Sequence, residues 1–161
     1  MPELKQTIRY CKAANGMAIA WATFGSGPPL VVSSAGGQHL EVYFRNAVSR
    51  PWIEGLARGH TLIRYDGLGS GLSDRSIRQF SLDNAVADLE AVVEAAGATR
   101  FALFAQNWGA HAAIAYAARN PNRVERLVLY GGSVRGLFRG NPSPERLRIR
   151  EASFAALRTY P

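Results

Sequence analysis

Short runs of apolar residues alternate along this chain with segments whose apolar positions recur every three or four residues. The short runs predict β-strands, and the segments with helical spacing predict helices. The predicted strands cover residues 8–12, 17–24, 30–33, 61–65, 100–105 and 124–130. The predicted helices cover residues 52–58, 82–96 and 109–119. Because strands and helices alternate, we expect an α/β fold with a mostly parallel sheet and helices on both faces.

Turn and cap residues mark the ends of several predicted elements. Asn15-Gly16 lies between the first two strands and predicts a hairpin, so the chain is expected to open with an antiparallel pair. Ser81 is suited to cap the long helix and Gly97 to stop it. That helix carries one apolar stripe, formed by Leu82, Val86, Leu89 and Val93. After residue 134 the alternation ends, and Asn141-Pro-Ser-Pro starts a basic helical segment.

The stretch Phe101-Ala-Leu-Phe-Ala-Gln-Asn107-Trp-Gly109-Ala110 carries the candidate chemistry. It predicts a strand that runs through a sharp turn into a helix, and small residues, Ala105 and Gly109, flank Asn107 as a strained turn requires. The free N–H groups at the start of such a helix favour negative charge, so the turn has the outline of an oxyanion site. Neutral Asn107 is a poor nucleophile, and the alternative is an ordinary strand-turn-helix crossover. We interpret the present physical role of Asn107 as a cap of the following helix.

Composition limits the class of protein. The 161 residues, of which 47% are hydrophobic, suffice for one domain with a sizeable core. The net charge is +7, and residues 134–161 hold six arginines against two acidic residues. No helix-turn-helix, RNA-binding sheet or zinc-ligand spacing accompanies this charge, so we expect neither a metal site nor nucleic-acid binding as the main function. The single cysteine, Cys11, and the lack of a long apolar run or a signal peptide predict a cytoplasmic protein without a membrane span.

Three motifs, in this order and spacing, resemble the α/β-hydrolase fold. They are Gly25-Ser-Gly-Pro-Pro-Leu-Val-Val, Arg64-Tyr-Asp-Gly-Leu-Gly-Ser-Gly-Leu-Ser-Asp74 and the turn around Asn107. The likeness is greatest to the hydrolase-like domains that bacteria attach to regulatory modules. Gln106-Asn-Trp-Gly109 also resembles the Gln-Asp-Trp-Gly turn of epoxide hydrolases and haloalkane dehalogenases.

The resemblance covers about residues 8–134 and implies a division of the chain. Residues 1–134 would form the N-terminal half of a hydrolase core, and residues 135–161 would start a cap-like basic helical segment. The nucleophile position falls on Asn107. The implied oxyanion or ligand-binding residues are Gly36, Gly37, His39 and Trp108, among which the backbone N–H groups of Gly36 and Trp108 would be the oxyanion donors.

The catalytic acid and histidine of the family follow the nucleophile in the chain, and this sequence ends before those positions. His60 and His111 are interpreted as structural, because His60 precedes a strand and His111 lies on the helix after the turn. We therefore predict a hydrolase-like protein with an incomplete catalytic set, inactive alone and without a cofactor. One alternative is a ligand-sensing or protein-interaction module of a regulatory protein. Another is a truncated or mutated ester or epoxide hydrolase, in which Asn107 replaces Asp or Ser.

The last predicted strand, residues 124–130, would leave one edge of the sheet bare. Three explanations stay open: a second copy that pairs as a homodimer, a separate chain that supplies the C-terminal half, or a longer parent protein. The expected ligand or substrate is a small molecule in each case.

Overall fold

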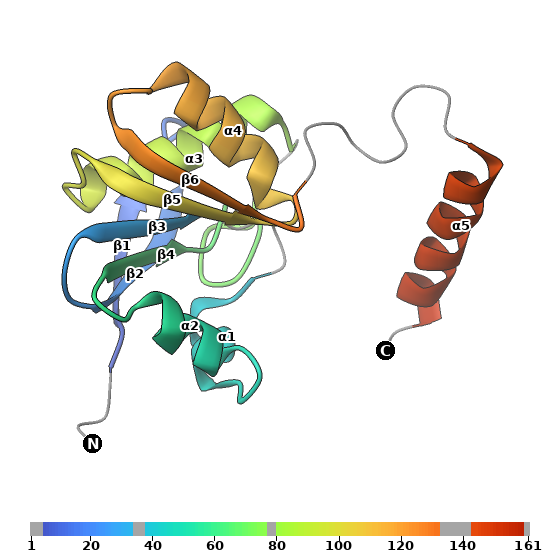
Figure 1. The fold of residues 1–161 in the computed structure, drawn as a ribbon, viewed down its shortest axis with the longest axis horizontal. Coiled ribbons are helices and arrows are strands. Elements are labelled where there is room, and N and C mark those ends of the chain that lie inside the picture. The colour runs from blue at the N-terminus through green and yellow to red at the C-terminus, as the bar shows by residue number, and fades with distance from the viewer. Residues whose placement is uncertain (1–4, 34–37, 77–79, 133–142, 160–161) are drawn as a thin grey trace.

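The structure is a computed structural model that describes residues 5–33, 38–76, 80–132 and 143–159 (Figure 1). The strands are β1 (Thr7–Lys12), β2 (Ala18–Gly25), β3 (Pro29–Ser33), β4 (Thr61–Tyr65), β5 (Phe101–Gln106) and β6 (Val124–Tyr130). The helices are α1 (Leu40–Arg45), α2 (Arg50–Leu56), α3 (Leu82–Ala95), α4 (Gly109–Arg119) and α5 (Pro144–Thr159). None of the helices in the described ranges is long and apolar enough to cross a membrane.

The strands form one sheet in the order β1-β2-β4-β3-β5-β6. β1 pairs with β2 and β2 with β4 in antiparallel register, whereas β4, β3, β5 and β6 run parallel. The predicted α/β fold with an N-terminal hairpin is therefore confirmed. In the hairpin turn, Gly16 has a φ of +82°, which glycine adopts without steric cost. Asn15 Oδ1 accepts a hydrogen bond of 3.1 Å from the N–H of Met17 in the same turn.

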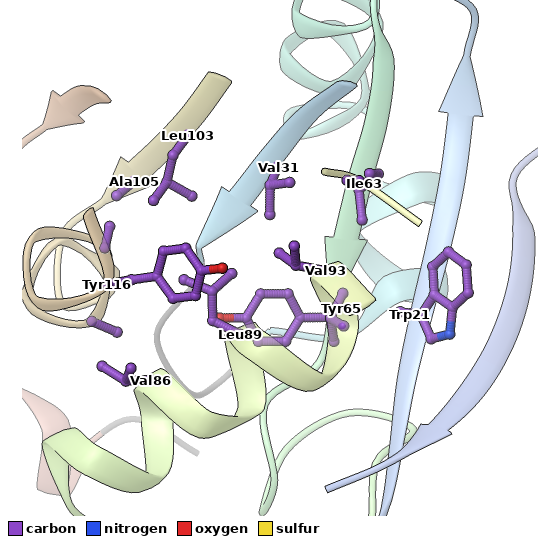
Figure 2. Packing of buried hydrophobic residues seen from close by; sticks show 14 of the residues in the cluster. Trp21, Val31, Ile63, Tyr65, Val86, Leu89, Val93, Leu103, Ala105 and Tyr116 are labelled. Carbon is purple, nitrogen blue, oxygen red and sulfur yellow. The ribbon is translucent and has the colours of Figure 1, made fainter. Parts of the chain in front are cut away.

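Helices cover both faces of the sheet (Figure 1). α3 and α4 pack on one face, where their buried side chains surround Val31 and Leu103 of the sheet (Figure 2). α1 and α2 pack on the other face, where Phe44 and Ile53 join Leu30 in a second apolar cluster. Neighbouring residues of β3 thus serve opposite cores because successive side chains point to opposite faces of a strand.

α3 largely follows the sequence prediction. Ser81 caps it by accepting a hydrogen bond of 3.1 Å from the N–H of Asn84, and Gly97 follows the helix with a φ of +65°. The predicted apolar stripe is buried except at Leu82, which is 47% exposed. Leu82 is the first helical residue and lines a pocket at the helix start, so it contributes to a surface instead of the core.

Two helices on the second face differ from the prediction. α1 was not expected, because six residues with two buried apolar positions, Leu40 and Phe44, are too few for a helical period to be recognised. α2 begins two residues earlier and ends two residues earlier than the predicted range 52–58, since Pro51 occupies its first turn.

β6 forms one edge of the parallel part of the sheet. In the described part of the chain it pairs with β5 alone. Four consecutive apolar or aromatic residues of this strand are between 37% and 53% exposed: Leu127, Val128, Leu129 and Tyr130. Among the described residues, the outer edge of β6 is therefore unpaired, as the sequence predicted. The strand also exposes apolar side chains to solvent.

Candidate functional site

A strained turn joins β5 to α4. Asn107 has a φ of +51° and is the one non-glycine residue with positive φ in the described part of the chain. Asparagine tolerates this left-handed conformation better than most residues do. The turn leaves Asn107 exposed at the carboxyl end of β5. A left-handed residue directly between a strand and a helix is the geometry that presents a side chain above the end of a sheet.

The helix-capping role predicted for Asn107 is wrong. The N-cap residue of α4 is Trp108, which has helical backbone angles and makes no side-chain capping hydrogen bond. Asn107 contributes its backbone carbonyl instead, which accepts a hydrogen bond of 3.2 Å from the N–H of Ala110. Asn107 forms the turn and precedes the N-cap residue, so its side chain does not occupy the N-cap position.

The chain leaving β6 passes close to this turn. The N–H of Asn107 donates a hydrogen bond of 2.9 Å to the carbonyl of Tyr130. Gly131 has a φ of +63°, and a Cβ atom there would lie 2.9 Å from Asn107 Oδ1. At Gly132 a Cβ atom would overlap the Cβ of Ala110. The two glycines therefore keep the space beside Asn107 clear of side chains.

A buried hydrogen bond connects the end of β3 to the start of α4. Ser33 is fully buried, and its Oγ donates a hydrogen bond of 3.0 Å to the carbonyl of Gly109. Ser33 comes shortly before Gly36 and Gly37, the residues of the predicted oxyanion segment. The bond therefore fixes the end of β3, just before that segment, next to the start of α4. Gly36 and Gly37 themselves lie outside the described residues. The sequence analysis missed Ser33, although a serine that ends an otherwise apolar strand was an available signal.

Asp66 binds Leu40, which follows the predicted oxyanion segment in the chain. Asp66 is fully buried, and its Oδ2 accepts hydrogen bonds from the N–H groups of Leu40 at 3.1 Å and Leu72 at 2.9 Å. Leu40 opens α1, so the carboxylate joins the start of α1 to the loop after β4. Burial raises the pKa of Asp66, while the hydrogen bonds from Leu72 and Leu40 and the nearby His39 oppose the rise.

His39, which we predicted to contact a ligand, is the residue before α1. It has extended backbone angles, and its Nδ1 is buried without a hydrogen-bond partner among the described residues. The Oδ1 of Asp66 is likewise buried and unpaired there. The structure thus brings His39 close to Asp66, and its contact with a ligand stays a prediction.

The other two histidines make local backbone contacts. His60 precedes β4 at the amino edge of the parallel strands, the opposite edge from Asn107, and its Nδ1 lies 3.1 Å from the carbonyl of Arg58. His111 lies in the first turn of α4, where its Nδ1 is 3.3 Å from the carbonyl of Trp108. Across the described ranges, no group of three or more His, Cys, Asp or Glu residues is placed to hold a metal ion.

Most of the chain, including the turn after β5, matches a known protein family. The family profile described as alpha/beta hydrolase fold matches residues 28–152. The chain belongs to the alpha/beta hydrolase fold family. The match begins just before β3 and extends into α5, so it includes the turn at Asn107 and both flanks of the predicted oxyanion segment.

Two curated relatives of this alpha/beta hydrolase are named as enzymes. The chain is 33% identical over 125 residues to a cis-3-alkyl-4-alkyloxetan-2-one decarboxylase from Shewanella oneidensis, covering 75% of this chain and 37% of that protein. It is 30% identical over 138 residues to a 2-hydroxy-6-oxononadienedioate/2-hydroxy-6-oxononatrienedioate hydrolase from Paraburkholderia xenovorans, covering 85% of this chain and 44% of that protein. The chain therefore spans less than half the length of either relative.

Solved structures share the fold. A haloalkane dehalogenase loop variant from Bradyrhizobium elkanii matches with a TM-score of 0.73 at 19% identity, over 94% of this chain and 50% of that chain. A hydrolase from Pseudomonas aeruginosa matches with a TM-score of 0.72 at 21% identity, over 96% and 54%. At these identities the likeness shows the fold alone.

Proposed function

We propose that the turn at Asn107 is the ligand-binding site of a hydrolase-like protein whose catalytic set is incomplete. The observation that supports this proposal is the left-handed backbone of Asn107 between β5 and α4. Such a conformation costs about 1–3 kcal/mol, persists only where the surroundings hold it, and is concentrated at functional sites. The hydrogen bond to the Tyr130 carbonyl holds the turn, and glycine at positions 131 and 132 gives it room.

The oxyanion donors belong to the same proposal. We assign them to the backbone N–H groups of Trp108 and Gly36, with Gly37 and His39 beside the ligand. Trp108 is the N-cap residue of α4, so its N–H lies at the positive end of the helix dipole. Ser33, before Gly36 in the chain, and Leu40, after it, each make a buried hydrogen bond, which favours this assignment. A carbonyl or epoxide oxygen bound here would be stabilised as it gains negative charge.

The amide of Asn107 is the reason that we propose no turnover for this chain alone. A neutral amide is a poor nucleophile, and loss of a nucleophile costs on the order of a millionfold in turnover. For the parent chemistry we propose hydrolysis of a small ester or epoxide, without a metal or organic cofactor. The enzyme names of the two curated relatives support a small-molecule ligand.

The test installs a nucleophile and looks for one covalent event. In Asn107→Asp, a carboxylate oxygen would attack an epoxide carbon and form an ester as the ring opens, and the ring oxygen would take a proton from water. Incubation with styrene oxide should add one substrate mass to Asn107→Asp by intact mass spectrometry and none to the unchanged chain. Asn46→Asp, at the exposed C-cap of α1, is the matched control and should stay unlabelled.

A second arm tests ester chemistry. Asn107→Ser should take up one acetyl group from p-nitrophenyl acetate and release one equivalent of p-nitrophenol, because the hydroxyl oxygen attacks the ester carbonyl. If both variants fold and neither is labelled by a panel of epoxides and activated esters, the hydrolytic origin is rejected. The alternative function, a ligand-sensing or protein-interaction module, is then favoured.

The exposed edge of β6 supports a second proposal, that another chain or a downstream half of the fold pairs with it. The apolar residues from Leu127 to Tyr130 favour such pairing, since exposed edges with apolar flanks invite added strands. Light scattering of this chain should show a dimer if a second copy pairs there. Val128→Lys should then give a monomer, whereas Val48→Lys, at a position 80% exposed outside the sheet, should not. A monomeric unchanged chain would reject the homodimer and leave a complementing half.

We also propose that residues 1–134 form the hydrolase core and that residues 135–161 begin a cap-like segment. A chain ending at residue 134 should then keep the thermal unfolding midpoint of the whole chain within a few degrees. A large drop would show that the final segment belongs to the core. The single cysteine supports a cytoplasmic location, which fractionation of the source cells would test.

A further inference from the structure

A pocket lies beside the turn and is separate from Asn107. It has a volume of about 700 Å³ and lies between the β1–β2 turn, the loop after β4 and the first turns of α3 and α4. Trp108 and Gly109 are part of its wall, whereas Asn107 is not. Ligand pockets in proteins commonly enclose about 300–1,000 Å³. The pocket is therefore large enough for a small organic molecule.

The wall of this pocket is mainly apolar. Leu68, Ala85 and Ala112 contribute aliphatic surface, and two aromatic residues stand at its rim. These are Phe80, which is 75% exposed, and Trp108, which is 81% exposed. Aromatic side chains that are left so exposed gain most by covering an apolar partner, because each can bury about 150–250 Å².

The charges of the wall narrow the class of ligand. None of the described residues that line the pocket is a lysine or an arginine, so these residues offer an anion no positive side chain in exchange for its hydration. Asp88 is 7% exposed, and its Oδ2 already accepts a hydrogen bond of 3.1 Å from the N–H of Leu68. Burial raises the pKa of Asp88, which favours the neutral acid and disfavours a cation as partner.

The polar groups of the wall can orient an uncharged molecule. His111 uses Nδ1 for the carbonyl of Trp108 at 3.3 Å, so its Nε2 is the ring nitrogen left for a ligand. Ser76, whose side chain carries a hydroxyl group, is also a lining residue. A few polar groups on an apolar wall are the usual composition of a small-molecule site.

We propose that this pocket binds an uncharged, largely apolar small molecule at a site distinct from Asn107. Trp108 separates the two sites: its backbone belongs to the turn, and its side chain forms part of the pocket rim. A ligand here would cover Trp108 and Phe80 and leave the space beside Asn107 open.

The test uses a neutral dye, N-phenyl-1-naphthylamine, and its anionic relative 1-anilinonaphthalene-8-sulfonate. The neutral dye should bind with saturable fluorescence gain and more tightly than the anion. Ala85→Phe fills the pocket from a half-buried position of α3 and should weaken binding by about tenfold or more. Ala118→Phe makes the same change at an exposed position of α4 outside the pocket and should leave the affinity unchanged.

Ala87→Phe, at a second position in the wall, is the partner variant if Ala85→Phe fails to fold by circular dichroism. Absence of saturable binding, preference for the anionic dye, or equal loss in Ala118→Phe would overturn the proposal. Covalent labelling of Asn107→Asp tests the turn independently. Dye binding without labelling would therefore reject only the proposed function, and labelling without dye binding would reject only this pocket.

Discussion

Ser33 Oγ donates a buried hydrogen bond of 3.0 Å to the carbonyl of Gly109, although the two residues are 76 positions apart in the chain. The bond joins the last residue of β3 to the first residue of α4, which comes two residues after Asn107. Burial raises the pKa of Tyr65 to about 12, and the Ser33 hydroxyl, a hydrogen-bond partner of Tyr65, opposes that rise. Ser33 thus links the ends of β3 and β4 to the start of α4 through one hydroxyl group.

Ser33→Ala should lower the free energy of unfolding by about 0.5–1.5 kcal/mol, because the buried hydrogen bond from its hydroxyl to the Gly109 carbonyl would be lost. Urea denaturation followed by circular dichroism measures the change. Ser26→Ala, at an exposed turn position, is the control and should change stability by less than about 0.5 kcal/mol. Equal stability of the two variants would contradict the role of Ser33.

Gly71→Ala should destabilise the protein far more than Gly16→Ala. Both glycines have positive φ, so both variants carry a backbone cost of about 1–2 kcal/mol. At Gly71 the added Cβ would also overlap the carboxylate of Asp66, whereas at Gly16 it meets open space. Thermal unfolding should therefore show a much larger drop in midpoint for Gly71→Ala. Similar drops would mean that the loop after β4 moves aside without losing the Asp66 hydrogen bonds.

The left-handed turn predicts an order of stability at position 107. Asn107→Gly should be at least as stable as Asn107→Ala, and Asn107→Val should be the least stable by about 1–2 kcal/mol, because a β-branched side chain fits poorly at a φ of +51°. Chemical denaturation of the three variants gives the order. Equal stability for glycine and valine would show that the turn is not held in this conformation in solution.

Asp88 should contribute a pH dependence to stability. Burial raises its native pKa above the unfolded value of about 3.9, so the folded chain holds the proton longer. The free energy of unfolding therefore falls as the pH rises from the unfolded to the native pKa, and this contribution is constant above that window. Asp88→Asn keeps an acceptor for Leu68 and does not titrate, so it should flatten this part of the profile.

Urea unfolding at a series of pH values from about 4 to 7 measures that slope. Asp83→Asn removes an exposed carboxylate from the same helix and controls for the loss of one negative charge. A slope that is the same in Asp88→Asn as in the unchanged chain would contradict the prediction.

Local patterns in the chain were sufficient for much of the fold. β4, α4 and β6 have the bounds that apolar spacing and turn residues predicted, because the pattern of apolar side chains repeats within a few residues in both helices and strands. The cap at Ser81 follows the same logic, since its partner Asn84 is three residues away. α1 was not predicted because its six residues are too few to show a helical period. Its buried side chains, Leu40 and Phe44, pack against residues of the sheet.

Contacts between distant residues decided the site. The order of the residues identified the turn at Asn107, but its left-handed backbone depends on a hydrogen bond to Tyr130 in another strand. Asp66 reaches Leu40, 26 positions earlier, and nothing in the local sequence names that partner. Leu82 belongs to an apolar stripe in the sequence, but in the fold it is 47% exposed and lines a pocket. Periodicity therefore specifies which face of an element is apolar, whereas packing of the elements specifies what that face meets.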